Sequence, residues 1–468
     1  MPIVLMEGHD YEYPVSDVLR MFFGHCMTLS SGKIQAGRDG EEIIHSSLSD
    51  SGVRTWIEGR PVRILPDEVR DDLPPNREIK RQLYLLLSRY LGVSFPWGSL
   101  TGIRPTLVAR EEKSVETLEN TYFVRRDKAL LAMETVKNED KILEEIPENS
   151  LCMYIGVPFC RSRCSYCSFI SADAAGHLAM LPDYSNAVIC EMDDYFKDKR
   201  PDVSCLYIGG GTPTVYDDIL FKEFIDGVFR IIAKNNINEI TVEAGRPDTI
   251  TEQKLRVLKD AGVSRICINP QTLSDRTLAA IGRKHTTADF FHAYDLALKF
   301  GFKTMNTDLI AGLPDEAAED FAKSIDTIIG MRPDNITVHT LSKKRRSEIS
   351  RDTVLSDCAD EIDRLDRMLH YSHTRLNETG YYPYYLYRQK DTVGGHENTG
   401  YSTTGHACAY NVAMMSDKRS VLAFGAGSVS KRVLPDGHLE RSPNIRDPHE
   451  YILRSAEMAQ RKKRFFDI

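Results

Sequence analysis

The sequence predicts an α/β fold: a partial (β/α)6 barrel with an N-terminal α+β accessory domain and a C-terminal cap. Two observations predict it. From about residue 150, short apolar, β-branched runs alternate with longer helical stretches, which is the pattern of parallel βα units. The residues before that point lack the alternation. Right-handed crossovers wrap such units into an open sheet or a partial barrel, so ligands are expected at the carboxyl ends of the strands.

The repeated part of the chain contains six expected strands and six expected helices. The strands are short and rich in branched apolar residues: 152–157, 205–208, 239–243, 265–269, 303–310 and 335–341. The helices have apolar residues at helical spacing: 183–197, 219–234, 251–261, 287–300, 316–331 and 359–378. Each helix between two strands is long enough to make a parallel crossover.

The N-terminal part mixes both kinds of element. Strands are expected at residues 2–6, 54–58 and 61–64, and helices at 13–23, 77–91 and 125–145. The Pro74-Pro75 pair marks a boundary. Beyond the sixth strand the chain becomes aromatic and glycine-rich. We therefore expect three domains: an accessory domain with a helical linker at 1–148, a barrel core at 149–342 and a C-terminal cap or substrate domain at 343–468.

Composition narrows the class of protein. The chain has 468 residues, of which 41% are hydrophobic and 27% are charged, as in ordinary soluble proteins. The net charge of −8 gives no general attraction to nucleic acid. No run approaches the roughly 18 apolar residues of a membrane span, and the first residues do not resemble a signal peptide. Ten cysteines in such a chain favour a reducing, cytoplasmic location.

Three cysteines stand together just after the first expected strand, in the run Cys160-Arg-Ser-Arg-Cys164-Ser-Tyr-Cys167. Three thiolates can hold three irons of a cubane iron–sulfur cluster and leave the fourth iron open for chemistry. The alternatives are a zinc site or three unrelated buried thiols. Structural zinc prefers four ligands, often as paired Cys-x-x-Cys, and the next histidine, His177, stands ten residues beyond the last cysteine. The spacing favours the cluster.

Polar and glycine residues mark the ends of the following strands. The second strand runs into the glycine-rich segment 209–214, which would let a ligand touch the backbone. Glu243, Gln271 and Asp308 lie at or near the ends of later strands, and Arg283 follows the fourth strand. A carboxylate can bind an ammonium or ribose hydroxyls, and an arginine can grip a carboxylate. Beside an open iron, this set suits an amino acid joined to a nucleoside, which is S-adenosylmethionine.

These residues and their neighbours resemble radical S-adenosylmethionine (radical SAM) enzymes of the oxygen-independent coproporphyrinogen III oxidase-like family. The match is closest to the HemZ-type coproporphyrinogen dehydrogenases of that family. The matching segments span most of the chain: 100–106, 154–169, 209–214, 269–271, 281–285, 308–314, 337–341 and 384–390. The cysteine motif is specific for the superfamily, and the combination of segments is specific for the subgroup.

The resemblance implies cofactors and contacts. Cys160, Cys164 and Cys167 would ligate a 4Fe–4S cluster whose fourth iron is bound by S-adenosylmethionine. The matching cofactor contacts are Tyr154, Gly210, Gly211, Thr212, Glu243, Gln271, Arg283 and Asp308. In the family reaction, a 5′-deoxyadenosyl radical takes a hydrogen from a propionate side chain of coproporphyrinogen III. Loss of carbon dioxide and one further electron then leaves a vinyl group, and two such decarboxylations give protoporphyrinogen IX for haem biosynthesis. A low-potential electron donor is also implied.

Two positions depart from the better-known oxidase. Gly156 stands where that enzyme has a histidine, and Phe169 where it has a further cysteine. Two alternatives for the function therefore stay open. One is a haem chaperone that keeps the fold and the cluster without decarboxylating a substrate. The other is a radical enzyme that modifies haem without oxygen.

Contacts to the tetrapyrrole substrate are expected after the sixth strand. Coproporphyrinogen carries four carboxylates, which suits an aromatic pocket with cations at its rim. Lys343, Arg345 and Arg388 are the candidate cations, although a solvated basic turn or a packed core would also explain them. If the ligand is haem, His339 or His396 could serve as an axial ligand, but a lone histidine more often has a structural role.

Overall fold

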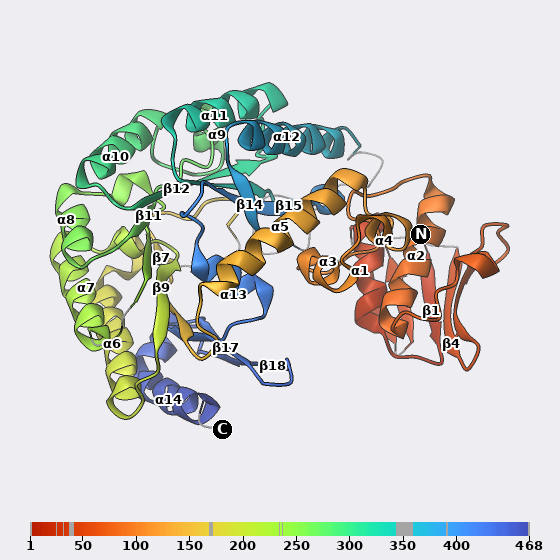
Figure 1. Ribbon diagram of the computed structural model, residues 1–468, viewed down its shortest axis with the longest axis horizontal. Coiled ribbons are helices and arrows are strands. Elements are labelled where there is room, and N and C mark those ends of the chain that lie inside the picture. Colours follow the sequence, from red (N-terminus) through yellow and green to blue (C-terminus); the bar gives the residue numbers. More distant parts are fainter. Residues whose placement is uncertain are drawn as a thin grey trace. The chain divides into compact units, whose positions relative to one another are not determined.

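A computed structural model describes residues 2–24, 26–30, 32–36, 42–167, 172–233, 235, 237–342, 359–389 and 392–466 (Figure 1). The chain divides into two compact units, and each is described by itself. Unit 1 comprises Met1–Val136, Thr340–Asp366 and Leu386–Asn398. Unit 2 comprises Lys137–His339, Arg367–Tyr385 and Thr399–Ile468. The division into three domains stays a prediction.

Unit 1 begins with a five-stranded sheet in the order β2-β3-β1-β4-β5. Its strands are β1 (Ile3–Glu7), β2 (Cys26–Ser30), β3 (Lys33–Ala36), β4 (Ile43–Ser49) and β5 (Gly52–Ile57). Helices α1 (Glu12–Phe23) and α2 (Pro75–Leu91) pack against each other and against the sheet. Phe22 and Leu83 are fully buried in the resulting core. This is the α+β arrangement that the sequence predicts.

Two details of this sheet differ from expectation. No strand was expected from the sequence at β2, β3 or β4. β2 exposes four of its five residues and so lacks the alternation of a half-buried strand, whereas β3 and β4 do alternate and were missed. The strand expected at 61–64 is wrong: that segment forms only an isolated bridge between Arg63 and Trp56.

The rest of unit 1 is mainly helical. It contains α3 (Pro105–Glu112), α4 (Val115–Asn120) and the first part of α5 (Arg126–Glu144), which continues into unit 2. A second apolar cluster joins these helices around the fully buried Trp97, with Leu118, Tyr122 and Leu386 among its members. Because Leu386 is far from Trp97 in sequence, this part of unit 1 depends on a segment that arrives late in the chain.

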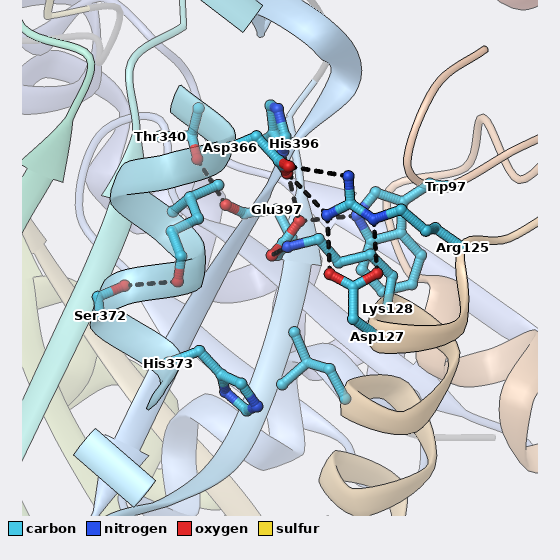
Figure 2. Close-up of polar contacts among 12 residues, drawn as sticks. Trp97, Arg125, Asp127, Lys128, Thr340, Asp366, Ser372, His373, His396 and Glu397 are labelled. Atoms are coloured by element: carbon cyan, nitrogen blue, oxygen red, sulfur yellow. Dashed lines mark hydrogen bonds and ion pairs between the residues drawn. The ribbon is translucent and has the colours of Figure 1, made fainter. Parts of the chain in front are cut away.

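A buried ionic network lies in unit 1 (Figure 2). Glu397 accepts hydrogen bonds from Lys128 Nζ at 2.5 Å and from Trp97 Nε1 at 2.8 Å. Burial alone would raise the pKa of Glu397, but Lys128 and the neighbouring His396 hold it down at about 2. A buried carboxylate is tolerated only when it is paired and hydrogen-bonded. The network therefore ties residues 97, 128 and 397 into one structural element.

Unit 2 is built on parallel βα repeats. The strands β6 (Leu151–Val157), β9 (Val203–Gly210), β10 (Glu239–Glu243), β11 (Arg265–Cys267) and β12 (Thr304–Ala311) pair in parallel in this order. β13 (Asn335–Thr340) lies next to β12 in the sheet. All six strands expected from the sequence are present. Most of their residues are buried, as in strands covered on both faces.

The crossover helices form an outer layer around these strands (Figure 1). They are α6 (Leu181–Asp198), α7 (Asp218–Ile232), α8 (Glu252–Asp260), α9 (Asp275–Ala280), α10 (Thr287–Phe300) and α11 (Ala318–Met331). Several begin with side-chain caps, such as Asp217 at α7 and Thr286 at α10, which satisfy free backbone N–H groups. Every crossover helix expected from the sequence is present, and α9 is an additional short one.

The C-terminal part extends the sheet on both sides. α12 (Ala359–Glu378) leads to β14 (Tyr382–Arg388) and β15 (Glu397–Ser402), and β15 runs antiparallel to β13. After α13 (Ala409–Ser416), β16 (Val421–Phe424) pairs in parallel with β6 and is followed by β17 (Val429–Val433) and β18 (Leu439–Pro443). α14 (Pro448–Phe466) packs on α6. The expectation of a partial barrel with accessory parts is confirmed by this architecture.

α6 and α14 are joined by a second buried network. Glu191 of α6 accepts hydrogen bonds from Lys462 Nζ, from Asn444 Nδ2 at 3.0 Å and from Tyr451 Oη at 2.5 Å. These four residues are all buried. The last helix is thus held to the barrel by specific polar pairing as well as by apolar packing. No helix in the described ranges is long and apolar enough to cross a bilayer.

Candidate active site

The cysteine loop starts where β6 ends. Val157 is the last residue of β6, and Cys160 follows in the two-residue strand β7 (Phe159–Cys160). The Cys167 N–H donates to the Cys164 carbonyl at 3.0 Å, which closes a turn between these two cysteines. The Ser165 N–H donates to the Ile281 carbonyl at 3.1 Å and anchors the loop to the segment after α9. The loop therefore has defined contacts at the carboxyl end of the parallel strands.

The three thiols interact electrostatically, and two of them accept hydrogen bonds from neighbouring side chains. Burial raises the pKa of Cys160, and charge on Cys167 or Cys164 raises it further. Thr212 Oγ1 donates to Cys160 Sγ at 3.5 Å, and Arg246 Nη1 donates to Cys164 Sγ at 3.3 Å. Donors and a cation beside sulfur favour thiolates, which are the ligands of an iron–sulfur cluster. This donor set fits the cluster.

The glycine segment at the end of β9 is required first by the chain itself. A Cβ on Gly209 would lie 2.9 Å from Glu243 Cδ, and one on Gly211 would lie 2.6 Å from the Phe159 carbonyl oxygen. Gly210 has a φ of +115°, which L side chains rarely adopt. Its N–H donates to Glu243 Oε2 at 3.1 Å. The glycines thus allow β9 to pass close to β7 and to the carboxylate of β10.

Glu243 ends β10 with both carboxylate oxygens engaged. Tyr207 Oη donates to Oε1 at 2.5 Å, and the Gly210 N–H donates to Oε2. Part of the residue is exposed, but its carboxylate is enclosed, and this burial, together with the charge of Asp308, raises the pKa to about 7. Near neutral pH the group can therefore take up or lose a proton. A cation arriving beside it would favour the ionised form.

Asp308 in β12 is held by two amides. Asn269 Nδ2 donates to Oδ2 at 2.8 Å, and Asn306 Nδ2 donates to Oδ1 at 2.9 Å. His339 Nε2 lies 3.5 Å from Oδ2. Asn306 lies in β12 itself, Asn269 follows the end of β11 and His339 lies in β13, so the carboxylate is oriented by neighbouring strands of the sheet. An oriented, partly exposed carboxylate of this kind can accept hydrogen bonds from ligand hydroxyls.

Gln271 and Arg283 each carry a buried polar atom that could form a hydrogen bond with a ligand. Gln271 adopts φ +69°, a left-handed conformation that costs a residue with a side chain about 1 kcal/mol or more. Gln271 Oε1 and Arg283 Nε are buried and have no hydrogen-bond partner among the described residues. Arg283 is otherwise held by its Nη1, which donates to the Asn269 carbonyl at 2.8 Å. Buried unsatisfied groups beside Glu243 and the cysteine loop fit a polar ligand such as S-adenosylmethionine.

Three tyrosines stack inside unit 2. The ring of Tyr154 lies 5.8 Å from that of Tyr410, and the ring of Tyr207 lies 4.7 Å from that of Tyr410. Burial and the charge of Glu243 raise the pKa of Tyr154. Tyr410 comes from α13, far beyond the six repeats in sequence. Because Tyr207 also donates to Glu243, this aromatic stack extends to the carboxylate at the end of β10.

Several of these residues were not predicted from the sequence. Tyr207 lies in an identified strand, three residues before the predicted contact Gly210, and Asn269 follows another identified strand, two residues before the predicted contact Gln271. Arg246 follows Glu243 by three residues in an irregular segment, and only the fold brings it to Cys164. His285 is buried with neither ring nitrogen hydrogen-bonded within the described ranges, and burial together with Arg283 lowers its pKa to about 4.

Of the three cations predicted to contact the substrate, the structure describes only Arg388. Lys343 and Arg345 lie outside the described residues. Arg388 belongs to unit 1, where its guanidinium is buried and donates to the carbonyls of Leu100 and Gly395. Its role in substrate binding stays a prediction. In the part of the chain that is described, no three His, Cys, Asp or Glu side chains converge on one point as a single metal ion requires.

Comparison with known proteins identifies the class. The Radical SAM superfamily profile matches residues 154–328. HemZ of Bacillus subtilis (strain 168), an oxygen-independent coproporphyrinogen-III oxidase-like protein, is 35% identical over 97% of this chain and 95% of its own length. The haem chaperone HemW of the same organism is 34% identical over 40% of this chain and 49% of its own length.

A solved structure shares the fold. The coproporphyrinogen III oxidase HemN from Escherichia coli, a radical SAM enzyme, superposes with a TM-score of 0.50 at 19% identity, covering 68% of this chain and 72% of its own. The chain therefore belongs to the Radical SAM superfamily and, within it, to the oxygen-independent coproporphyrinogen-III oxidase-like family typified by HemZ. Membership of this superfamily implies a 4Fe–4S cluster and S-adenosylmethionine as cofactors.

Proposed function

We propose that this protein converts coproporphyrinogen III into protoporphyrinogen IX by oxygen-independent oxidative decarboxylation. The observation that carries the proposal is the near full-length similarity to HemZ, an oxidase-like protein, in a chain that also retains the complete polar rim around the cysteine loop.

The cluster would be held by Cys160, Cys164 and Cys167, and S-adenosylmethionine by the residues at the strand ends. When bound, these cofactors supply a 5′-deoxyadenosyl radical by one-electron cleavage of the sulfonium. Thr212 and Arg246 stabilise the thiolates through the donors described above. The protein thus sets the charge around the cofactors and leaves the radical chemistry to them.

The strand-end residues divide the work of binding by their chemistry. Glu243, with its pKa near 7, ionises to receive a ligand ammonium while Tyr207 and Gly210 keep the carboxylate in place. Arg283 offers its Nε to a ligand carboxylate, and Gln271 offers its Oε1 to a ligand hydroxyl or N–H. Asp308, fixed by two amides, accepts from ribose hydroxyls. The ligand would thus supply the hydrogen-bond partners that Arg283 Nε and Gln271 Oε1 lack among the described residues. Glu243 and Asp308 are already held in place to receive it.

A haem chaperone is the second candidate, because HemW matches 40% of this chain at 34% identity. Such a protein would keep the same fold and cofactor residues and would bind haem without turning it over. His339, whose side chain is partly exposed beside Asp308, is the candidate axial ligand in that case. His396 is fully buried in unit 1, and a ligand could reach it only after the surrounding network opened.

One anaerobic experiment separates the candidates. The cluster is reconstituted, and S-adenosylmethionine, a low-potential reductant and coproporphyrinogen III are added, with a parallel reaction that contains haem. Carbon dioxide, protoporphyrinogen IX and 5′-deoxyadenosine are measured by mass spectrometry. The Asp308→Asn variant is assayed in parallel because it keeps the three cysteines while weakening a proposed cofactor contact.

We expect carbon dioxide and 5′-deoxyadenosine in a fixed ratio with coproporphyrinogen III, and a loss of both of at least tenfold in the variant. Stoichiometric haem binding without product from coproporphyrinogen III would overturn the oxidase proposal in favour of the chaperone. Formation of 5′-deoxyadenosine only in the reaction with haem would instead favour a haem-modifying radical enzyme.

A further inference from the structure

Arg246 lies in the segment between β10 and α8 and reaches back to the cysteine loop. The residue is 3% exposed. Its Nη1 donates to Cys164 Sγ at 3.3 Å, and its Nη2 donates to Ser162 Oγ at 2.8 Å. Its Nε lies 3.3 Å from Asp248 Oδ1. All three guanidinium nitrogens are therefore used, and one of them points at a sulfur that we assign to the cluster.

The contact to sulfur is separable from the contacts that hold the loop. The loop has other tethers to the same neighbouring segments: Arg161 Nη1 donates to the Asp248 carbonyl at 2.6 Å, and the Ser165 N–H donates to the Ile281 carbonyl. The loop position thus does not depend on Arg246 alone. The Nη1–Sγ hydrogen bond, by contrast, is a charge-assisted contact to Cys164 Sγ itself, and Arg283 is a second guanidinium that interacts with this thiol.

Hydrogen bonds to cluster sulfurs and nearby positive charge raise the reduction potential of an iron–sulfur cluster, because they stabilise the more negative reduced form. Burial strengthens this effect, since little water competes for the guanidinium. Arginine also stays charged at every accessible pH and holds a fixed planar geometry, which lysine does not. Arg246 has each property that a residue tuning a cluster ligand would need.

We propose that Arg246 is a positioning residue that, through its hydrogen bond to Cys164 Sγ, raises the reduction potential of the cluster and so eases delivery of the first electron. This inference rests on the proposed ligation of the cluster by Cys164. Its chemical consequence is specific: loss of the guanidinium disfavours the reduced cluster while the iron content stays the same.

The test is a redox titration of the reconstituted full-length protein, with the reduced cluster quantified by electron paramagnetic resonance. Arg246→Gln removes the charge and most of the hydrogen bond. Arg246→Lys keeps the charge without the planar fork. Ser162→Ala is the matched control, because it removes the loop tether to Nη2 and leaves the sulfur contact in place. Iron content and visible absorbance are measured for each variant.

We expect Arg246→Gln to lower the reduced-to-oxidised ratio at a fixed potential about tenfold, which is about 59 mV for one electron. Arg246→Lys should lower it by a smaller factor, and Ser162→Ala should leave it unchanged. A wild-type potential in Arg246→Gln, or an equal shift in Ser162→Ala, would overturn the proposal. If Arg246→Gln does not retain its iron, the test depends on Arg246→Lys. A wild-type potential in Arg246→Lys would then overturn the proposal, because it would show that the guanidinium hydrogen bond does not set the potential.

Failure of this inference is distinguishable from failure of the proposed ligation. If Cys164 does not bind the cluster, then Cys164→Ala keeps the wild-type iron content and absorbance. If Cys164 does bind it but Arg246 has no influence, then Cys164→Ala loses the cluster while Arg246→Gln keeps both iron and potential.

Discussion

Glu243 offers a direct test of the electrostatics of the site. Replacing it with glutamine imitates the protonated side chain, because the amide oxygen can accept from the Gly210 N–H while the amide nitrogen faces Tyr207 Oη. The native carboxyl has a pKa of about 7, against an ordinary value of 4.5, chiefly because it is buried. The variant therefore removes only the cost of ionising the group in the folded chain.

The sign and size of the effect follow from linkage. The folded chain keeps a proton on Glu243 that the unfolded chain releases above pH 4.5, so wild-type stability falls as the pH rises from about 4.5 to about 7 and then levels off. Each tenfold change in the dissociation constant is about 1.4 kcal/mol, which makes the full cost about 3 kcal/mol. Because part of Glu243 is exposed and screened by water, we expect about 1–3 kcal/mol.

The assay compares the free energies of unfolding of the wild-type and Glu243→Gln apoproteins at pH 5 and pH 8. Far-UV circular dichroism is the appropriate signal, because both tryptophans, Trp56 and Trp97, lie in unit 1 and fluorescence would not report on unit 2. The variant should be more stable by about 1–3 kcal/mol at pH 8 and close to wild type at pH 5. Glu252→Gln, an exposed carboxylate on α8, should differ by less than about 0.5 kcal/mol at both.

A stability difference for Glu243→Gln that does not change with pH would refute this reasoning, because it would mean that the carboxyl is not held protonated by the fold. A loss of stability at both pH values would mean that the hydrogen bonds donated by Tyr207 and Gly210 require a carboxylate as acceptor.

Three further predictions test other parts of the chain. Cys164→Ala should abolish the brown chromophore after reconstitution, whereas Cys190→Ala, at an exposed position, should keep it; equal iron in the two variants contradicts the ligand assignment. Lys128→Met leaves the Glu397 carboxylate buried and unpaired, so urea unfolding followed by tryptophan fluorescence should show a loss of about 3–5 kcal/mol; a loss below about 1 kcal/mol contradicts the buried pair. Gln271→Gly relieves a left-handed strain and should change apoprotein stability by less than about 1 kcal/mol, while equilibrium dialysis should show at least tenfold weaker binding of S-adenosylmethionine; unchanged affinity rules out the amide contact.

Regular elements were predictable where the local pattern is strong. The six strands of the βα repeats have continuous apolar runs, and their crossover helices have apolar residues at helical spacing. Both patterns involve only residues that are close together in the sequence. The strand β2 was missed because it lies at the edge of its sheet and exposes most of its side chains, and an edge strand need not alternate. The interior strands β3 and β4 do alternate, but they are short or rich in serine, so their pattern is weak. The segment 61–64 has apolar character but no partner along its length, and a strand forms only when its backbone groups find partners.

The residues of the candidate site also divide into those that could be predicted from the sequence and those that could not. Its residues at strand ends were accessible to sequence reasoning, because parallel strands present their carboxyl ends at one edge. Arg246 and Tyr410 were not, since an irregular segment and a helix more than a hundred residues beyond the second strand carry no local sign of where they will lie. The glycines at 209–211 were predicted as a ledge for a ligand, and the structure adds that the chain's own packing already demands them.

The sequence by itself determined the repeated βα pattern, the spacing of the three cysteines and the kinds of polar group at the strand ends, because these are local properties of the chain. Only the tertiary structure decided which donors face the sulfurs and why Glu243 has a pKa near 7. It also decided that Arg388 donates its hydrogen bonds to backbone carbonyls. Those properties depend on burial and on distances between residues far apart in sequence. Electrostatic energies respond to both, and a linear pattern contains neither.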